Sequence, residues 1–205
     1  MINSITLLEK ITIAPPRAKI YSRLGFRKKT SLTSSQKQET DRHIEDAAAL
    51  ISLQGSFLIL PLTGHDGRTI RLAGGLSFES EKLAAFLGQC REAALMGATA
   101  GSAIMDAIRE KTSAGNLTTA VVYDATASEM ADAALDWMMA YINRQLRREG
   151  KQLLPRRFSA GYSDFALTNQ KALHQILQLE KFGVTLTPNF LLIPEKSVTA
   201  VTGIP

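Results

Sequence analysis

The stretch from about Leu117 to Glu149 contains neither proline nor glycine, and this most limits what the chain can fold into. Met130, Ala134, Trp137 and Tyr141 recur along it at helical spacing, which predicts one long helix with an apolar face. At ~1.5 Å per residue that helix would be roughly 45 Å long. We therefore expect it to be the spine around which the rest of the molecule packs.

Helices and strands are expected on both sides of this spine, without regular strand-helix-strand repetition. The predicted helices cover residues 17–25, 35–53, 81–90 (capped by Ser80), 102–115 and 167–183, the last stopped by Gly183. Strands are predicted within 4–14, in a hairpin over 55–74, at 91–101 and twice within 184–204. This mixture favours an α+β fold with a largely antiparallel sheet.

The 205 residues suffice for a single domain, 1–205, with a division into a helix and hairpin part (1–80) and a second part (81–205) as the alternative. No apolar run reaches the ~20 residues that a membrane helix needs. The N-terminus lacks the pattern of an export signal, so we expect a cytoplasmic location. Cys90 is the single cysteine, either a small buried residue or a reactive thiol, which excludes an internal disulfide.

The net charge of +5 is unevenly distributed, because half of the 24 basic residues lie in two short stretches. The first contains Arg17, Lys19, Arg23, Arg27, Lys28 and Lys29, and the second contains Arg144, Arg147, Arg148, Lys151, Arg156 and Arg157. Such stretches are either solvated basic faces or surfaces for nucleic acid, phosphate-bearing ligands or acidic proteins.

Familiar catalytic motifs are absent from the sequence. It has no GxGxxG, GxxxxGK[ST], HExxH or GxSxG, which disfavours nucleotide-binding folds, zinc proteases and serine hydrolases. The three histidines are far apart in sequence, and we predict neither a metal site nor catalytic residues. "DRHIED" (41–46) lacks the glycine of a cobalamin-binding Asp-x-His-x-x-Gly motif and is interpreted as a solvated helix face. His65-Asp66 is interpreted as turn chemistry.

The candidate binding segment is "RRFSAGYSDF" (156–165), which has no helical or strand period. Together with "LTNQKALHQIL" and "KFGVTLTPNFLLIPEKSVTAVTGI" it resembles the C-terminal activation domain of cobalamin-dependent methionine synthase. "AALMGATAGSAIMDAI" and "YDATASEMADAALDW" resemble the corresponding parts of short stand-alone relatives. The resemblance covers about the last 120 residues.

This resemblance implies a bent, mostly antiparallel sheet with surrounding helices, including the long central one. It also implies binding of S-adenosylmethionine, whose methyl group serves the reductive remethylation of inactive cobalamin. Because the chain has no Asp-x-His-x-x-Gly, the cobalamin would come in trans, on a corrinoid protein or a methionine synthase lacking its own activation domain. A flavodoxin-like or other donor would supply the electron. Nucleic acid and membranes are not expected partners.

The implied ligand-binding residues are carried by the motif. Arg157 matches the motif arginine, and its guanidinium can grip a carboxylate with two hydrogen bonds. Gly161 lets backbone approach the ligand, and the amides of Ser159 and Ala160 can bond adenine or ribose. Tyr162 offers an aromatic face. The alternative is a structural Arg157–Asp164 pair with Tyr162 in the core.

Asp132 lies where the family has an acidic residue near the ligand, and a carboxylate there could hold the ammonium or sulfonium. Thr185 and Thr187 match the family's Leu-Thr strand and are expected to support the loop. The family's N-terminal aspartate segment and a tyrosine segment that would lie beyond Pro205 have no match. The alternative function is therefore a corrinoid-protein docking or assembly module that has lost S-adenosylmethionine binding.

Overall fold

The computed structural model describes residues 4–26 and 32–205. Arg27, Lys28 and Lys29 of the first basic stretch lie outside the described residues. None of the described helices is both long and apolar enough to cross a membrane.

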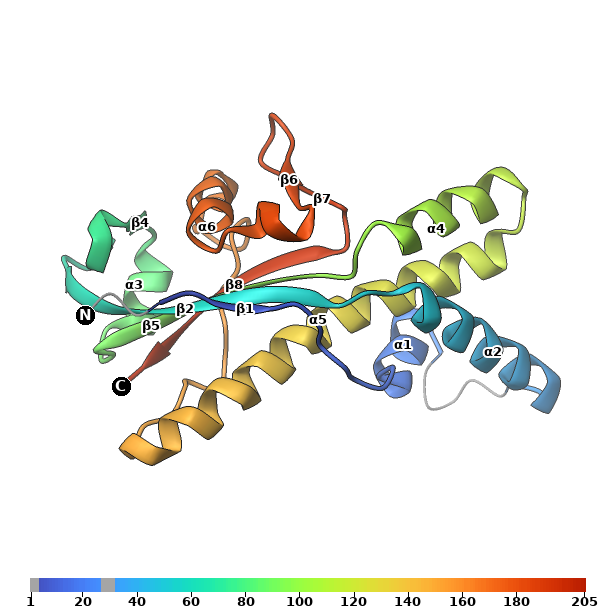
Figure 1. Ribbon diagram of the computed structural model, residues 1–205, viewed down its shortest axis with the longest axis horizontal. Coiled ribbons are helices and arrows are strands. Elements are labelled where there is room, and N and C mark those ends of the chain that lie inside the picture. Colours follow the sequence, from blue (N-terminus) through green and yellow to red (C-terminus); the bar gives the residue numbers. More distant parts are fainter. Residues whose placement is uncertain (1–3, 27–31) are drawn as a thin grey trace.

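A curled antiparallel sheet forms the centre of the molecule (Figure 1). Its strands are β1 (Thr6–Leu8), β2 (Gln54–His65), β3 (Thr69–Leu72), β4 (Ser77–Glu79), β5 (Glu92–Thr99) and β8 (Ser197–Ile204). They are ordered β4-β3-β2-β5-β8, and β1 also pairs with β2. A separate short hairpin joins β6 (Thr185–Leu186) to β7 (Leu192–Ile193).

Strand β2 links the two parts of the sheet. Residues 54–61 pair with β5, and the pairing with β3 begins at Leu62. The register shifts between Leu62 and Gly64, an irregularity of the kind that bends a strand. Residues on both sides of position 80 thus share one sheet, while the division into two subdomains stays a prediction.

The α-helices surround this sheet (Figure 1). They are α1 (Arg17–Arg23), α2 (Ser34–Leu50), α3 (Glu81–Leu87), α4 (Ala103–Ser113), α5 (Leu117–Leu146) and α6 (Gln170–Ile176). The predicted spine is confirmed as α5, which has 30 residues and continues into a 3-10 turn at Arg147–Glu149. The α+β class with a bent antiparallel sheet and a long central helix is likewise confirmed.

The prediction of a single helix over 167–183 is wrong. This segment consists of a 3-10 turn at Leu167–Asn169, helix α6 and a second 3-10 turn at Leu179–Phe182. Gln178 interrupts it with a φ of 50°, in the left-handed region. The break allows Leu177 and Leu179 on either side to bury themselves, with both side chains lying against Gly97 of β5. Tertiary packing therefore overrides the helical propensity of this segment.

The two faces of the sheet carry two hydrophobic cores. In β5, Ala94, Met96 and Ala98 belong to the core beneath α5, while Ala93 and Leu95 belong to the core beneath α3 and α6. This alternation is the period of two that a strand imposes on its side chains. Because β5 is buried on both faces, its continuous apolar sequence correctly predicted a buried strand.

Gly55 of β2 lies in a tightly packed position between β5 and α5. A Cβ atom built on Gly55 of β2 would lie 2.5 Å from Met138 Cε of α5 and 2.2 Å from the carbonyl oxygen of Gly97. The Met138 side chain could move away, but the backbone of β5 could not, so glycine is required where β2 and β5 meet at this point beneath α5.

The N-terminal half of α5 extends past the sheet, where α1, α2 and α4 pack around it (Figure 1). Ile20, Ile44, Val122 and Ala125 form a small core there. The interpretation of "DRHIED" as a solvated helix face holds for the exposed Arg42, Glu45 and Asp46 but is wrong for His43, which is buried with its Nε2 3.4 Å from Thr119 Oγ1 of α5. The 3.6-residue period of α2 turns His43 and Ile44 inward while the flanking charges face solvent.

Two smaller predictions can also be compared with the structure. Asp66 Oδ1 accepts the backbone N–H groups of Thr69 and Arg68, which confirms the turn. The bond from Thr69, with those from the Arg71 side chain and the Arg68 backbone, lowers the pKa of Asp66 to about 2. Cys90 is half-buried against the second core, and burial raises the pKa of its thiol. A thiol with a raised pKa is a poor nucleophile, which favours the packing interpretation of Cys90.

Candidate functional site

The segment 156–165 is an ordered loop fastened to the sheet at its start. Phe158 and Val201 of β8 exchange two backbone hydrogen bonds, of 2.8 and 2.7 Å. Phe165 at the other end is fully buried and meets Phe78 edge to face, with 5.2 Å between ring centroids. The loop between these anchors is therefore held in one shape by backbone pairing and aromatic packing.

Gly161 gives the loop its sharp bend. Its φ is 89°, in the region that side chains with a Cβ rarely adopt, and its N–H donates to the carbonyl of Phe165 at 2.7 Å. A Cβ there would also lie 3.2 Å from Leu167 Cδ1. The expectation for Gly161 was close approach of backbone to a ligand, but the residue does not line the cavity beside the loop. In the structure it shapes that loop.

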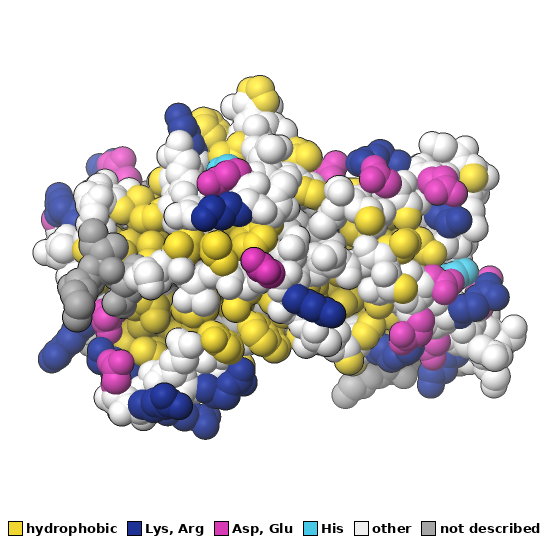
Figure 2. Space-filling model, viewed as in Figure 1, with side chains coloured by type: hydrophobic (Ala, Val, Ile, Leu, Met, Phe, Trp, Pro, Cys, Tyr) yellow, Lys and Arg dark blue, Asp and Glu magenta, His cyan; other side chains and the backbone are white. Residues whose placement is uncertain are grey.

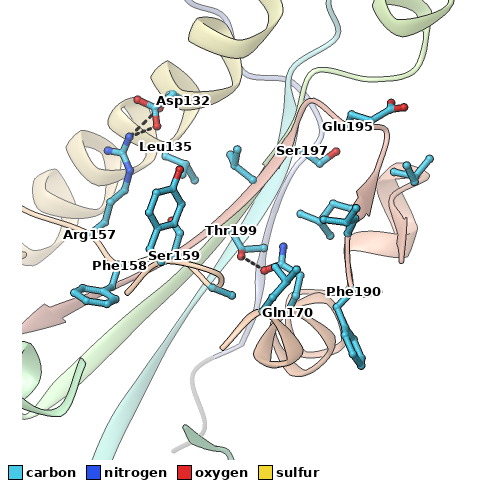
Figure 3. A pocket seen from close by; sticks show the side chains of 17 residues that line it. Asp132, Leu135, Arg157, Phe158, Ser159, Gln170, Phe190, Glu195, Ser197 and Thr199 are labelled. Atoms are coloured by element: carbon cyan, nitrogen blue, oxygen red, sulfur yellow. Dashed lines mark hydrogen bonds and ion pairs between the residues drawn. The ribbon is translucent and has the colours of Figure 1, made fainter. Parts of the chain in front are cut away.

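Beside the loop is a cavity of about 600 Å³, enclosed by the loop, α5, α6, β8 and the β6–β7 hairpin (Figure 3). Five of the six predicted site residues line it: Asp132, Arg157, Ser159, Ala160 and Tyr162. They come from α5 and from the loop, which are separated in sequence but adjacent in the fold. The volume is within the range of small-molecule sites.

Arg157 and Asp132 interact directly. Arg157 Nη2 donates to Asp132 Oδ1 at 2.5 Å, and Nη1 donates to Asp136, one turn further along α5. Lys19 of α1 binds the other carboxylate oxygen of Asp136 at 3.0 Å. We call Arg157, Asp132, Asp136 and Lys19 the charged cluster. It holds two positive and two negative charges, so it is balanced without a ligand.

Burial and pairing act in opposite directions on the pKa values of this cluster. Burial raises the pKa of Asp136, but hydrogen bonds from Arg157 and Lys19 lower it by more, so it lies below its ordinary value. Burial likewise lowers the pKa of Arg157, while its bonds to Asp136 and Asp132 more than restore it. Both groups therefore stay ionised at neutral pH.

The alternative in which Arg157 pairs with Asp164 and Tyr162 lies in the core is wrong on both points. Asp164 accepts instead from Ser80 Oγ, at 2.7 Å, and from the N–H of Lys82, at the start of α3. Ser80 Oγ in turn accepts from the N–H of Leu83, which confirms it as the helix cap. Tyr162 is 71% exposed at the rim of the cavity.

The opposite side of the cavity, on α6 and β8, is polar without ion pairs among the described residues. Thr199 Oγ1 donates to Gln170 Oε1 at 2.9 Å, and Ser197 Oγ donates to Thr99 Oγ1 at 2.8 Å. We call Gln170, Thr199, Ser197 and Thr99 the neutral cluster. All four are buried, and Glu195, the remaining charged lining residue, is exposed at the rim (Figure 3).

Apolar side chains complete the walls of the cavity. They are Leu135, Phe158, Leu167, Phe190, Leu191, Leu192, Ile193 and Val198. Sequence reasoning missed the β6–β7 residues and the neutral cluster as parts of the site. Pro188 and Pro194 do enclose the apolar run "NFLLI" in the sequence, which could have indicated a separate hairpin. Thr187 Oγ1 accepts from Leu191 N–H, so it supports this hairpin rather than the loop.

Ion pairs neutralise much of the two basic stretches. Arg17 binds Asp41 and Glu45, Arg23 binds Glu129, and Lys151 binds Glu92 and Glu149. In the described part of the chain, Arg147, Arg148 and Arg156 form no ion pair. Basic side chains gather at the lower left of the molecule, where the C-terminal end of α5 lies (Figure 2).

No family model matches the chain, and no curated protein matches it. Among solved structures it matches the MetH reactivation domain bound to AdoHcy, with a TM-score of 0.64 and 14% sequence identity. The match covers 94% of this chain and 70% of the other. At this identity the likeness establishes the fold. The resemblance stated from the motifs is therefore confirmed at the level of the fold.

Proposed function

We propose that this chain binds S-adenosylmethionine in the cavity beside the 156–165 loop and assists the reductive remethylation of cobalamin. The observation that carries the proposal is that five of the six residues implied by the motifs line one cavity. They do so in a chain with the fold of the MetH reactivation domain, whose solved structure contains AdoHcy.

The lining residues fit such a ligand. The amino-acid part of S-adenosylmethionine is a zwitterion, and Arg157 and Asp132 place a cation and an anion side by side for it. The exposed ring of Tyr162 offers a π face to the sulfonium or the purine. The apolar walls and the buried neutral cluster suit an uncharged nucleoside. The protein's task is then to hold and orient the methyl donor.

We propose that cobalamin brought by a partner would supply the nucleophile, since the sequence has no cobalamin-binding Asp-x-His-x-x-Gly motif. We propose that a separate corrinoid protein, or a methionine synthase without its own activation domain, is this partner. A flavodoxin-like protein is the proposed electron donor. The unpaired Arg147, Arg148 and Arg156 support docking of an acidic surface, since complementary charge steers association.

The test is calorimetric titration with S-adenosylmethionine of the unmodified protein and of Arg157→Ala. We expect the unmodified protein to bind and the variant to lose on the order of 2 kcal/mol or more. Arg23→Ala is the matched control, because Arg23 of α1 also pairs with a carboxylate of α5, Glu129, and neither residue lines the cavity. If both variants lost similar affinity for S-adenosylmethionine, the loss would come from disturbing α5 and not from a missing contact with the ligand.

One observation favours the alternative docking module. Two carboxylates already occupy the Nη atoms of Arg157, so a ligand carboxylate must compete with them. If S-adenosylmethionine fails to bind even with a corrinoid protein present, while that protein still docks, the alternative replaces the proposal.

A further inference from the structure

Gln170, the first residue of α6, has an unused hydrogen-bond donor. The residue is buried, with only 5% of its surface exposed. Its Oε1 accepts the hydroxyl of Thr199, whereas its Nε2 has no partner among the described residues. A buried primary amide with half of its capacity unused is uncommon in folded proteins.

The unused nitrogen faces the cavity. Gln170 lines the cavity, and Figure 3 shows its amide nitrogen on the side away from the bond to Thr199. In the described part of the chain, His43 Nδ1 is the one side-chain atom that is both sealed from solvent and without a partner. The Gln170 nitrogen is therefore not sealed, and the cavity is the space from which it is reached.

Thr199 holds the oxygen end of the Gln170 amide against β8 in the structure. Because its hydroxyl donates to Oε1, the amide oxygen is held against β8 and the NH₂ group is directed the other way. Thr199 is itself 3% exposed and belongs to the central part of β8, so this orientation rests on a rigid strand. Thr199 thus acts as a positioning residue for Gln170.

The surroundings of Gln170 indicate the chemistry of the acceptor. Thr199 and Ser197 are neutral, Leu167 and Phe190 are apolar, and the paired charges of Asp132 and Arg157 are carried by α5 and the loop. An ionic ligand group has charged partners at the charged cluster. A neutral acceptor suits the Gln170 side, where a lost N–H contact leaves a buried donor unsatisfied.

We propose that Gln170 selects the nucleoside part of the ligand, an inference that rests on the proposed function. Its Nε2 would donate to a ring nitrogen of the purine or to a ribose hydroxyl oxygen. The charged cluster then binds the amino-acid part. Specificity is divided between two sides of the cavity, with a neutral donor for the nucleoside and an ion pair for the zwitterion.

The experiment compares two ligands by calorimetry. S-adenosylmethionine has both parts, and 5′-methylthioadenosine has the nucleoside without the charged amino acid. Gln170→Leu is expected to weaken both ligands by the same factor, about tenfold. Arg157→Ala is expected to weaken S-adenosylmethionine alone. Gln175→Leu, on the same helix but outside this cavity, is the control and should leave both affinities unchanged.

Further variants distinguish loss of the Gln170 hydrogen-bond donor from misfolding. Gln170→Glu keeps the acceptor for Thr199 but removes the donor, so at about pH 8, well above the ordinary pKa of a glutamate, it should weaken both ligands as Gln170→Leu does. Thr199→Val should weaken both ligands by releasing the amide, and Thr199→Ser should restore them. Unfolding temperatures of all variants are measured in parallel.

The outcomes separate this inference from the proposed function. If the unmodified protein binds S-adenosylmethionine but Gln170→Glu binds both ligands as tightly, Gln170 is not the donor and the inference fails alone. Loss of S-adenosylmethionine affinity with unchanged 5′-methylthioadenosine affinity would place Gln170 at the amino-acid part and also overturn it. If the unmodified protein binds neither ligand, the proposed function fails and the inference falls with it.

Discussion

The two sides of the cavity differ in what they leave free for a ligand. The charged cluster on α5 and the loop is complete in itself, with each of Arg157, Asp132 and Asp136 already paired. The neutral cluster on α6 and β8 uses most of its groups internally but leaves the Gln170 nitrogen open. A ligand must therefore displace a partner on the charged side, whereas it adds a missing one on the neutral side.

This difference distinguishes two properties of a site residue: whether it lies at the cavity, and whether it is free to bind a ligand. Of the arginine and glycine-tyrosine pattern, Arg157 and Tyr162 line the cavity, whereas Gly161 shapes the loop beside it. The pattern does not indicate which of these residues is available, because availability depends on partners such as Asp136 and Lys19 from elsewhere in the chain. The 156–165 loop connects the two sides, since it carries Arg157 near its start and ends shortly before Gln170.

The largest expected effect comes from breaking the loop that both sides share. Phe165→Ala removes a fully buried ring packed against Phe78 and Phe158, which should cost about 3–5 kcal/mol of unfolding free energy. For a chain of this size the unfolding temperature should fall by roughly 6–20 °C, measured by circular dichroism. Tyr162→Ala, in the same loop but exposed, should change it little. Equal effects would mean that Phe165 does not anchor the loop.

A smaller effect is expected from the bend alone. Gly161→Ala forces a Cβ into a left-handed conformation close to Leu167, at a cost of about 1–2 kcal/mol. Gly64→Ala is the control, because Gly64 has an ordinary φ and open space around it. Denaturant unfolding of both variants measures the difference, and a Gly161→Ala protein as stable as the control would show that the bend tolerates a side chain.

The charged side alone can be tested by removing one competitor of the ligand. Asp136→Asn takes away one carboxylate that holds Arg157, so the guanidinium is freer to bind the ligand's carboxylate. We expect S-adenosylmethionine to bind about fivefold more tightly, in line with the strength of a partly exposed ion pair. Affinity for 5′-methylthioadenosine should not change.

Asp124→Asn is the matched control for this prediction. It removes an aspartate on the same helix that pairs with Lys196 and does not line the cavity. Weaker binding in Asp136→Asn would mean that Asp136 positions Arg157 for the ligand, and the charged cluster would then be preorganised rather than self-satisfied.

The sequence predicted the parts of this site that depend on local pattern. The helical period predicted α5, while the family resemblance indicated Asp132 and the loop as parts of the site. Asp136 could have been added, because it lies one helical turn after Asp132 on the same face. Gln170 could not, since its helix was expected to continue to Gly183 and only tertiary contacts show that Thr199, on a strand 29 residues away, orients its amide.

The smallest predicted effect concerns the link between the loop and α3, and it depends on pH. The hydrogen bond from Ser80, followed by the N–H of Lys82, lowers the pKa of Asp164 in the folded protein. A carboxyl group whose pKa is lower in the folded than in the unfolded protein stabilises the fold above its unfolded pKa of about 3.9. This stabilisation is lost as the pH falls through the pKa of the folded protein.

The unfolding temperature of the unmodified protein should therefore exceed that of Asp164→Asn by a constant amount near neutral pH. That margin should shrink below about pH 4, while Glu180→Gln, an exposed carboxylate outside the cavity, serves as the control. If this difference in unfolding temperature persisted at the lowest pH, Asp164 would link the loop to α3 through its shape rather than its charge. The loop would then keep both sides of the cavity together at acidic pH as well.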